Sequence, residues 1–228
     1  MKRLVGILLL VLFGACHSVH AQMGMGMDAF RRPMTFTKVF HPVVGKGAEY
    51  QMMRTGANDR VSKMQLGIVG KDSAGGQDAY WMQMVMSENN QEIVSKVLIS
   101  NSDFQPSRFI MQWPGRPAME MPVAMNATNR DKINSSLQDW HSAGTESITV
   151  PAGTFSCEHW KNDKTGEEVW TSDKVSPFGM VKQAGKDNSM ILLKVLDDYS
   201  DRITGPVQKF DPQLMMQQQM QRRQQPQQ

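Results

Sequence analysis

The feature that most limits the fold of this chain is a series of short alternating segments within residues 147–196. Three of them, at residues 154–160, 168–172 and 190–196, are rich in β-branched and aromatic side chains. Polar or glycine-containing turns, such as Pro151-Ala152-Gly153, separate the segments. Short runs of this kind, interrupted by Gly, Asp and Asn, are typical of an antiparallel meander. The stretch therefore predicts a β-sheet, and it contains no catalytic motif.

Further alternating segments precede this stretch. They span residues 35–40, 43–54, 61–69, 79–86, 93–100, 108–113 and 118–121, with a Gly/Asp/Ser turn at 70–77. Within 79–86, the side chains at even positions share one side of the strand and those at odd positions share the other. Both sides are largely apolar, which predicts either burial on both sides or one side that faces a groove.

One segment has a helical pattern instead. Ile133, Leu137 and Trp140 recur at the spacing of one helix face, and Asn129 can cap the helix start. We therefore expect a helix over residues 129–140.

The N-terminus predicts export. Two basic residues precede an apolar run of 12 residues at positions 4–15, and a more polar stretch ends in Ala21. This order is typical of a secretory signal peptide, and the run is shorter than the roughly 20 residues that span a bilayer. We expect cleavage after Ala21, which gives a periplasmic or secreted protein that begins at Gln22. In an alternative interpretation, Cys16 is acylated and anchors the chain as a lipoprotein.

The expected mature chain is nearly neutral. Loss of Lys2 and Arg3 lowers the formal net charge from +3 to +1, which leaves no basic surface of the kind that nucleic-acid binding needs. The remaining 207 of the 228 residues are enough for one domain with a sizeable core. Because Cys157 is its only cysteine, the mature chain cannot form an internal disulfide. We expect a monomer.

Composition divides the chain into four parts. The signal peptide, at 1–21, is followed by a Met/Gly-rich segment at 22–34 that we expect to be flexible. Residues 35–210 form a single predicted β-rich domain. The Gln-rich tail at 211–228 is predicted to be disordered, and it is either inert or contacts partners through its two arginines.

Two segments resemble a known group of proteins. Residues 150–157 (VPAGTFSC) and 168–175 (EVWTSDKV) resemble uncharacterised exported proteins of bacteria. These proteins are similar to the LolA-like superfamily of lipoprotein carriers and lipid-handling lipoproteins. The resemblance implies a curved antiparallel sheet whose concave face is plugged by helices and holds acyl chains in an apolar cavity. The predicted fold class is therefore mainly β, a curved and unclosed half-barrel with one or two helices.

The same resemblance implies a function without catalysis, namely binding or carriage of a lipid or lipoprotein acyl chain in the cell envelope. A membrane surface or envelope proteins would be further partners. The side chains predicted to line the groove are apolar: Met82, Met84, Phe109, Met111, Trp113, Met119, Met121 and Trp170. Each buried methylene of a ligand contributes about 0.8 kcal/mol, so a long chain needs no strong polar contact.

Few residues could carry catalysis. Cys157 and His159 lie two positions apart, on the same side of a predicted strand, and could form a nucleophilic pair. We favour the interpretation that Cys157 is a small buried apolar residue and that His159 is its partly exposed neighbour. The sequence contains no Gly-x-Ser-x-Gly, phosphate-binding glycine loop or His-Glu-x-x-His motif. We expect neither an enzyme nor a cofactor.

Methionine is unusually frequent, with 20 residues, and it forms Met-x-Met repeats at 23–27, 82–86 and 119–121. Thioethers are soft ligands that select Cu(I), so copper capture, above all by residues 23–27, is an alternative function. Methionine is also an adaptable apolar residue that fills cores and lines grooves. A purely structural envelope module is a third hypothesis.

Overall fold

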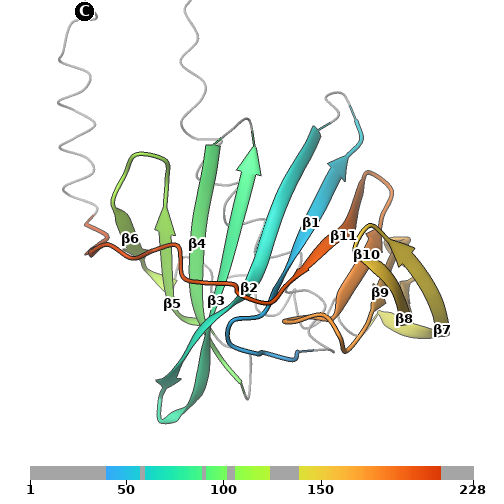
Figure 1. Ribbon diagram of the computed structural model, residues 1–228, viewed down its shortest axis with the longest axis horizontal. Helices are drawn as coiled ribbons and strands as arrows, with labels where there is room; N and C mark the ends of the chain where they lie inside the picture. The colour runs from blue at the N-terminus through green and yellow to red at the C-terminus, as the bar shows by residue number, and fades with distance from the viewer. Residues whose placement is uncertain (1–39, 57–59, 89–90, 102–105, 124–138, 212–228) are drawn as a thin grey trace, which may run out of the picture.

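The computed structural model describes residues 40–56, 60–88, 91–101, 106–123 and 139–211. Within these residues the chain forms twelve strands and no α-helix. The strands lie in a single unclosed sheet (Figure 1). The predicted signal peptide, the Met/Gly-rich segment and nearly all of the tail lie outside the described residues.

The first half of the sheet contains β1 (Gly47–Arg54), β2 (Arg60–Ala74), β3 (Gln77–Glu88), β4 (Gln91–Ser100), β5 (Pro106–Gln112) and β6 (Ala118–Met121). The second half contains β7 (Trp140–Val150), β8 (Gly153–Asn162), β9 (Glu167–Thr171), β10 (Met180–Ala184) and β11 (Asn188–Leu196). The last strand, β12 (Val207–Lys209), returns to the edge of the first half beside β6.

The strand order joins two antiparallel meanders side by side. It runs β12-β6-β5-β4-β3-β2-β1-β11-β10-β9-β8-β7. β1 pairs with β11 at the junction of the two meanders. Among the strand pairs described, only β12 and β6 are parallel. The prediction of a mainly antiparallel, unclosed sheet is confirmed.

The segments predicted to alternate correspond to strands, with two differences in detail. The turn of the second hairpin is shorter than predicted, because β2 continues to Ala74 and only Gly75 and Gly76 form the loop, both at positive φ. Two-residue hairpin loops favour glycine for this reason. The strands β10 and β12 were not predicted from the sequence, and the segment 35–40 lies outside the described residues except for Phe40.

The prediction of one or two helices is not confirmed in the described part of the chain. Of the segment 129–140, the residues up to 138 lie outside the described residues, and Trp140 begins strand β7. Trp140 is buried in the core from that strand, so a single apolar residue at helical spacing did not identify its local structure. Within the described ranges no helix is long and apolar enough to cross a membrane.

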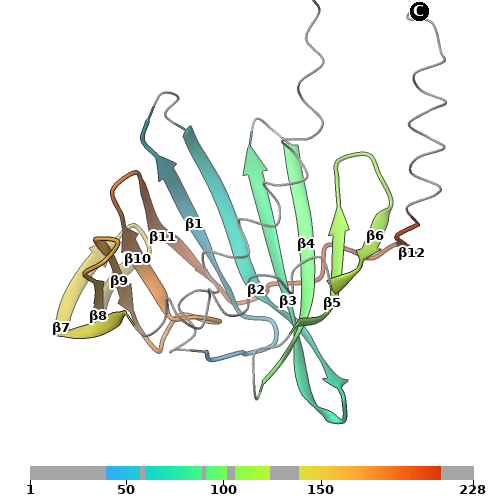
Figure 2. The ribbon, with the colours of Figure 1, turned by 180° about the vertical axis from the view of Figure 1, so that it is seen from behind.

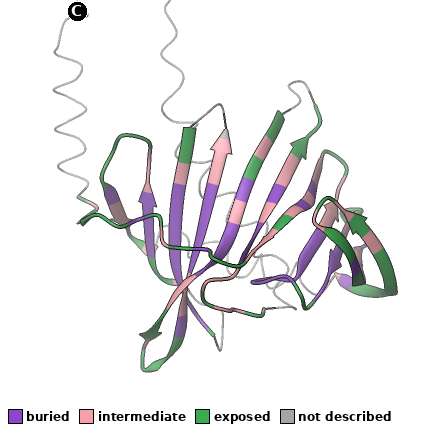
Figure 3. Cartoon of the chain, viewed as in Figure 1, coloured by how far each residue is buried: buried purple, intermediate pink, exposed green. Residues whose placement is uncertain are grey.

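One face of the sheet, here called the inner face, carries the main core. The register aligns buried side chains into rows that cross the strands. One row from β2 to β6 consists of Ile68, Met82, Val97, Phe109 and Met121. All five are buried, and Figure 3 shows the corresponding buried bands across neighbouring strands. A shift of one residue would turn each of these side chains to the other face.

The opposite face, the outer face, is crossed by the chain itself. Residues 197–206, here called the strap, run over the first half of the sheet on the way from β11 to β12 (Figures 1 and 2). The buried Gln83 on β3 donates a hydrogen bond to the carbonyl of Ser200 (3.1 Å) and accepts one from the amide of Arg202 (2.8 Å). Ile203 packs into a small second cluster on this face. β3 is therefore buried on both sides, which is the first of the two alternatives that its pattern predicted.

Two glycines allow the strap to lie close to the sheet. A Cβ atom on Gly67 would lie 2.4 Å from Cδ1 of Tyr199, and one on Gly47 would lie 3.2 Å from Cγ of the same ring. The Tyr199 hydroxyl donates a hydrogen bond to the carbonyl of Gln83 (3.4 Å). Burial raises the pKa of Tyr199 to about 12, so the ring stays neutral beneath the strap.

Candidate functional site

The residues predicted to line a groove lie in the main core. Met82, Met84, Phe109, Met111, Met121 and Trp170 are each at most 7% exposed. Trp113 and Met119 are half-buried and pack against the same cluster. The structure brings the residues of β3, β5 and β6 together on the inner face, whereas Trp170 lies on β9 in the other half of the sheet. Their role in binding stays a prediction.

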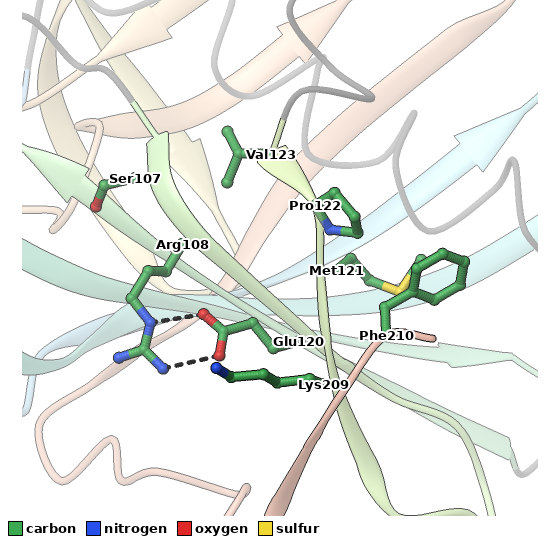
Figure 4. A pocket seen from close by; sticks show the side chains of 8 residues that line it. All are labelled: Ser107, Arg108, Glu120, Met121, Pro122, Val123, Lys209 and Phe210. Atoms are coloured by element: carbon green, nitrogen blue, oxygen red, sulfur yellow. Dashed lines mark hydrogen bonds and ion pairs between the residues drawn. The ribbon is translucent and has the colours of Figure 1, made fainter. Parts of the chain in front are cut away.

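A pocket of about 370 Å³ opens where β6 ends (Figure 4). Its lining combines two distant parts of the chain: Ser107, Arg108, Glu120, Met121, Pro122 and Val123 with Lys209 and Phe210. The parallel pairing of β12 with β6 brings these parts together, because Lys209 lies beside Glu120 in the register. The amide of Phe210 then donates to the carbonyl of Glu120 (2.9 Å).

The rim of the pocket is charged. Arg108 donates from Nε to Oε1 of Glu120 (2.7 Å) and from Nη2 to Oε2 (3.1 Å), a two-point contact that orients both groups. The hydrogen bond from Arg108, helped by the charges of Arg108 and Lys209, holds the pKa of Glu120 below its ordinary value against the effect of burial. The side chain of Lys209 forms no hydrogen bond or ion pair within the part of the chain that the structure describes. The rim therefore carries one more positive than negative charge.

The floor of the pocket is apolar and continuous with the core. Met121 belongs to the main inner-face cluster, and Val123 and Phe210 pack against it. Figure 4 shows Met121 and Phe210 beside each other, with Arg108, Glu120 and Lys209 grouped apart from them. A site with an apolar floor and a few polar groups at its rim is the usual form of a small-molecule pocket.

Of the eight predicted residues, only Met121 lines this pocket. Lys209 and Phe210 were missed because no strand was predicted near the C-terminus. Residues 207–210 (VQKF) place two polar residues between two apolar ones, so they lack the alternation that predicts a strand. The parallel pairing that makes these residues part of a site has no signature in the sequence.

A second polar cluster lies in the other half of the sheet. His159 on β8 contacts Oε1 of Glu146 through Nδ1 (2.8 Å) and Oε2 of Glu168 through Nε2 (2.7 Å). Both ring nitrogens of His159 therefore lie within hydrogen-bonding distance of a carboxylate oxygen. The ring also stacks on Trp170, with centroids 4.4 Å apart. The residue is 9% exposed and counts as buried. The interpretation of His159 as partly exposed is therefore wrong, because the Trp170 ring and two carboxylates enclose the imidazole.

Cys157 is not prepared for nucleophilic chemistry. Its thiol donates to the carbonyl of Phe155 (3.7 Å), and within the described residues no hydrogen bond links it to His159. Burial, and then the charge of Glu146, raise the pKa of the Cys157 thiol to about 11. Reactive cysteines have the opposite shift. The geometry fits the interpretation of Cys157 as a small buried apolar residue.

No arrangement of metal ligands accompanies these clusters. Among the described residues, no group of three His, Cys, Asp or Glu side chains could hold a metal ion. Met82 and Met84 of the second Met-x-Met repeat are buried among apolar side chains. The repeat at 23–27, on which the copper hypothesis mainly rests, lies outside the described residues.

Comparisons with known proteins find no family. No family model matches the chain, and no curated protein matches it. A presumed exported protein with a YmcC-like fold from Bacteroides fragilis is 13% identical, with a TM-score of 0.35, over 69% of this chain and 98% of that chain. A presumed lipoprotein from Parabacteroides distasonis is also 13% identical, with a TM-score of 0.33 and the same coverage. Both scores are too low to assign a fold family or a function, and the LolA-like resemblance stays a prediction.

Proposed function

We propose that this protein binds a hydrophobic ligand with an acyl chain and an anionic head, and that it holds or carries this ligand in the cell envelope. The observation that carries the proposal is the pocket at the end of β6. Its apolar floor is continuous with the inner-face core, and its rim has an excess of positive charge. The envelope location rests on the predicted signal at residues 1–21.

The apolar part of the ligand would lie against the edge of the inner face. From Met121 in the pocket, the same face continues to Met119 and then to Trp113, and both are only half-buried. A chain lying along them would remove apolar surface from water on both sides of the contact. At about 0.8 kcal/mol for each buried methylene, a few carbons suffice for measurable affinity.

The head of the ligand would lie at the rim. Arg108 is already held by Glu120, whereas Lys209 is exposed and has no ion pair among the described residues. Lys209 is therefore the cation available to an acidic head group. A charge at this position adds selectivity for anionic ligands, and the chain supplies most of the affinity.

The test is a titration of the mature chain with a fluorescent fatty acid analogue. Trp113→Asp places a charge on the acyl path, and we expect it to weaken binding by about tenfold, as the loss of one to two methylene contacts would. Val61→Asp is the matched control, because Val61 is 63% exposed and lies on β2, away from the pocket. A folded sample that takes up no analogue would overturn the proposal.

The anionic head is tested separately. Lys209→Glu reverses the charge of an exposed side chain, so the fold should be unaffected. We expect it to weaken binding of the fatty acid analogue and to leave binding of its uncharged methyl ester unchanged. An equal loss of affinity for both ligands would contradict the role of Lys209. Unchanged affinity for both would show that the head group of the ligand does not bind at Lys209.

A further inference from the structure

The strand β7 forms one edge of the sheet. β8 pairs with one side of it, and none of the strands described pairs with the other side. β7 has 11 residues, most of them exposed, whereas the opposite edge is the three-residue β12. A long exposed edge strand presents unpaired N–H and C=O groups to which another strand can add.

Within residues 145–150, this edge carries few of the features by which proteins usually prevent strand addition. β7 contains no proline, lysine or arginine, and these are the common protective residues. Its one irregularity, between Ser142 and Gly144, lies before the regular stretch 145–150. The carboxylate in that stretch, Glu146, is held within its own sheet by His159 (2.8 Å).

The pairing of β7 with β8 determines which backbone N–H and C=O groups of β7 point outward and can bind another strand. Val150 pairs with Gly153 across a two-residue turn, and alternate residues of an antiparallel strand direct their N–H and C=O groups to opposite sides. Thr145, Ser147 and Thr149 therefore direct theirs away from β8.

We propose that a second copy of this chain pairs with this edge, β7 against β7, antiparallel about a two-fold axis beside Ser147. Ser147 then faces the partner's Ser147, and Thr145 faces the partner's Thr149. Every pair that exchanges backbone hydrogen bonds consists of hydroxyl side chains, which form favourable cross-strand pairs. Glu146 faces the partner's Ile148 and not a second carboxylate.

This self-complementarity is the reason to choose a second copy as the occupant. Two-fold pairing of identical surfaces is the commonest form of homo-oligomer. The dimer would replace the monomer expected from the sequence and is independent of the proposed ligand. Because one strand pair buries little surface, its formation should depend on concentration.

The first test is cross-linking of the mature chain with Ser147→Cys. Facing residues that exchange both backbone hydrogen bonds have Cα atoms about 5.5 Å apart, a distance that a disulfide can bridge. Under mild oxidation we expect a covalent dimer. The control is Thr165→Cys in the exposed turn after β8, which should remain a monomer. Equal cross-linking of the two variants would overturn the proposal.

The second test is sedimentation of the unmodified mature chain over a range of concentrations, compared with Ser147→Pro. Because the Ser147 amide points outward, proline preserves the ladder to β8 and removes a donor that the partner needs. We expect the dimer dissociation constant to rise by about tenfold or more, since each copy loses one hydrogen bond. Ser147→Thr keeps the amide and should leave the constant unchanged. A chain that stays monomeric at every concentration, or a folded S147P variant that still dimerises, would disprove the interface.

Discussion

The strands β2–β5 and β7–β9 belong to one sheet but are held in different ways. β3 and its neighbours are covered on both faces, by the apolar inner-face rows and by the strap. β7 is exposed along most of its length and is connected to β8 and β9 through the contacts of Glu146, His159 and Glu168. The first region is covered on both faces. The second contributes Phe155, Cys157 and Val169 to the shared core, but its carboxylate contacts lie at partly exposed positions.

This difference has consequences for stability. Burial of apolar surface is insensitive to pH and costly to disturb, whereas partly exposed ion pairs contribute little and depend on ionisation. We therefore expect mutations in the two regions to differ in size and in pH dependence. The following predictions test this difference.

The largest effect is expected from Met84→Ala on β3. Met84 is fully buried in the inner face, and replacing a buried Met by Ala costs about 2–5 kcal/mol of unfolding free energy. Denaturant unfolding measures this directly. Met53→Ala is the matched control, because Met53 is 41% exposed, and it should change stability by no more than about 0.5 kcal/mol. If M84A lost as little unfolding free energy as M53A, the inner face around β3 would not be a tightly packed core.

An intermediate effect is expected from Gly67→Ala beneath the strap. The added Cβ would lie 2.4 Å from the Tyr199 ring, and such overpacking costs about 1–3 kcal/mol. Thermal unfolding at a fixed pH would show a lowered Tm. Gly205→Ala, also in the strap, is the control, because its Cβ would meet no atom within 4 Å. Equal Tm values for the two variants would show that the strap is not in close contact with the sheet at Gly67.

The smallest effect, and the one with a pH dependence, is expected from Glu168→Gln on β9. Although burial opposes it, the hydrogen bond from His159 and the charge of Lys161 hold the pKa of Glu168 below its ordinary value. A lowered folded-state pKa stabilises the fold above the ordinary glutamate pKa of about 4.3 and stops doing so as the pH falls through the lowered value.

The E168Q variant should thus be less stable than the natural chain near neutral pH, by up to about 1 kcal/mol because the pair is partly exposed. The difference should disappear in acid. Urea unfolding of both proteins between neutral pH and strong acid checks this sign. A difference that grows as the pH falls would show that Glu168 is not held as an ionised partner.

Much of the strand content followed from local pattern. The segment 79–86 predicted β3, and its two largely apolar sides predicted either burial on both sides or one side facing a groove, because the strand pleat has a period of two. Trp140 shows the limit of such reasoning, since one apolar residue at helical spacing belongs to β7. β12 was missed because three exposed residues have no pattern that distinguishes a strand from a loop.

The site was predictable only in part. Alternation indicated that Met82 and Met84 share a face, and that Phe109 and Met111 do so. The alternation could not indicate that this face is buried, because its burial depends on contacts with segments elsewhere in the chain. The pocket at the end of β6 shows the same limit, since Lys209 joins Glu120 only through a parallel pairing.

The sequence by itself determined that the protein is built from antiparallel strands and which side chains share each side, because both properties depend on neighbouring residues. Only the tertiary structure decided which sides are buried, where the pocket opens and which strand is left at the edge. These features depend on contacts between distant residues, such as the hydrogen bond from Arg202 to Gln83, 119 positions apart. No local pattern encodes such a contact, because its free energy arises only when the strap and the sheet have come together.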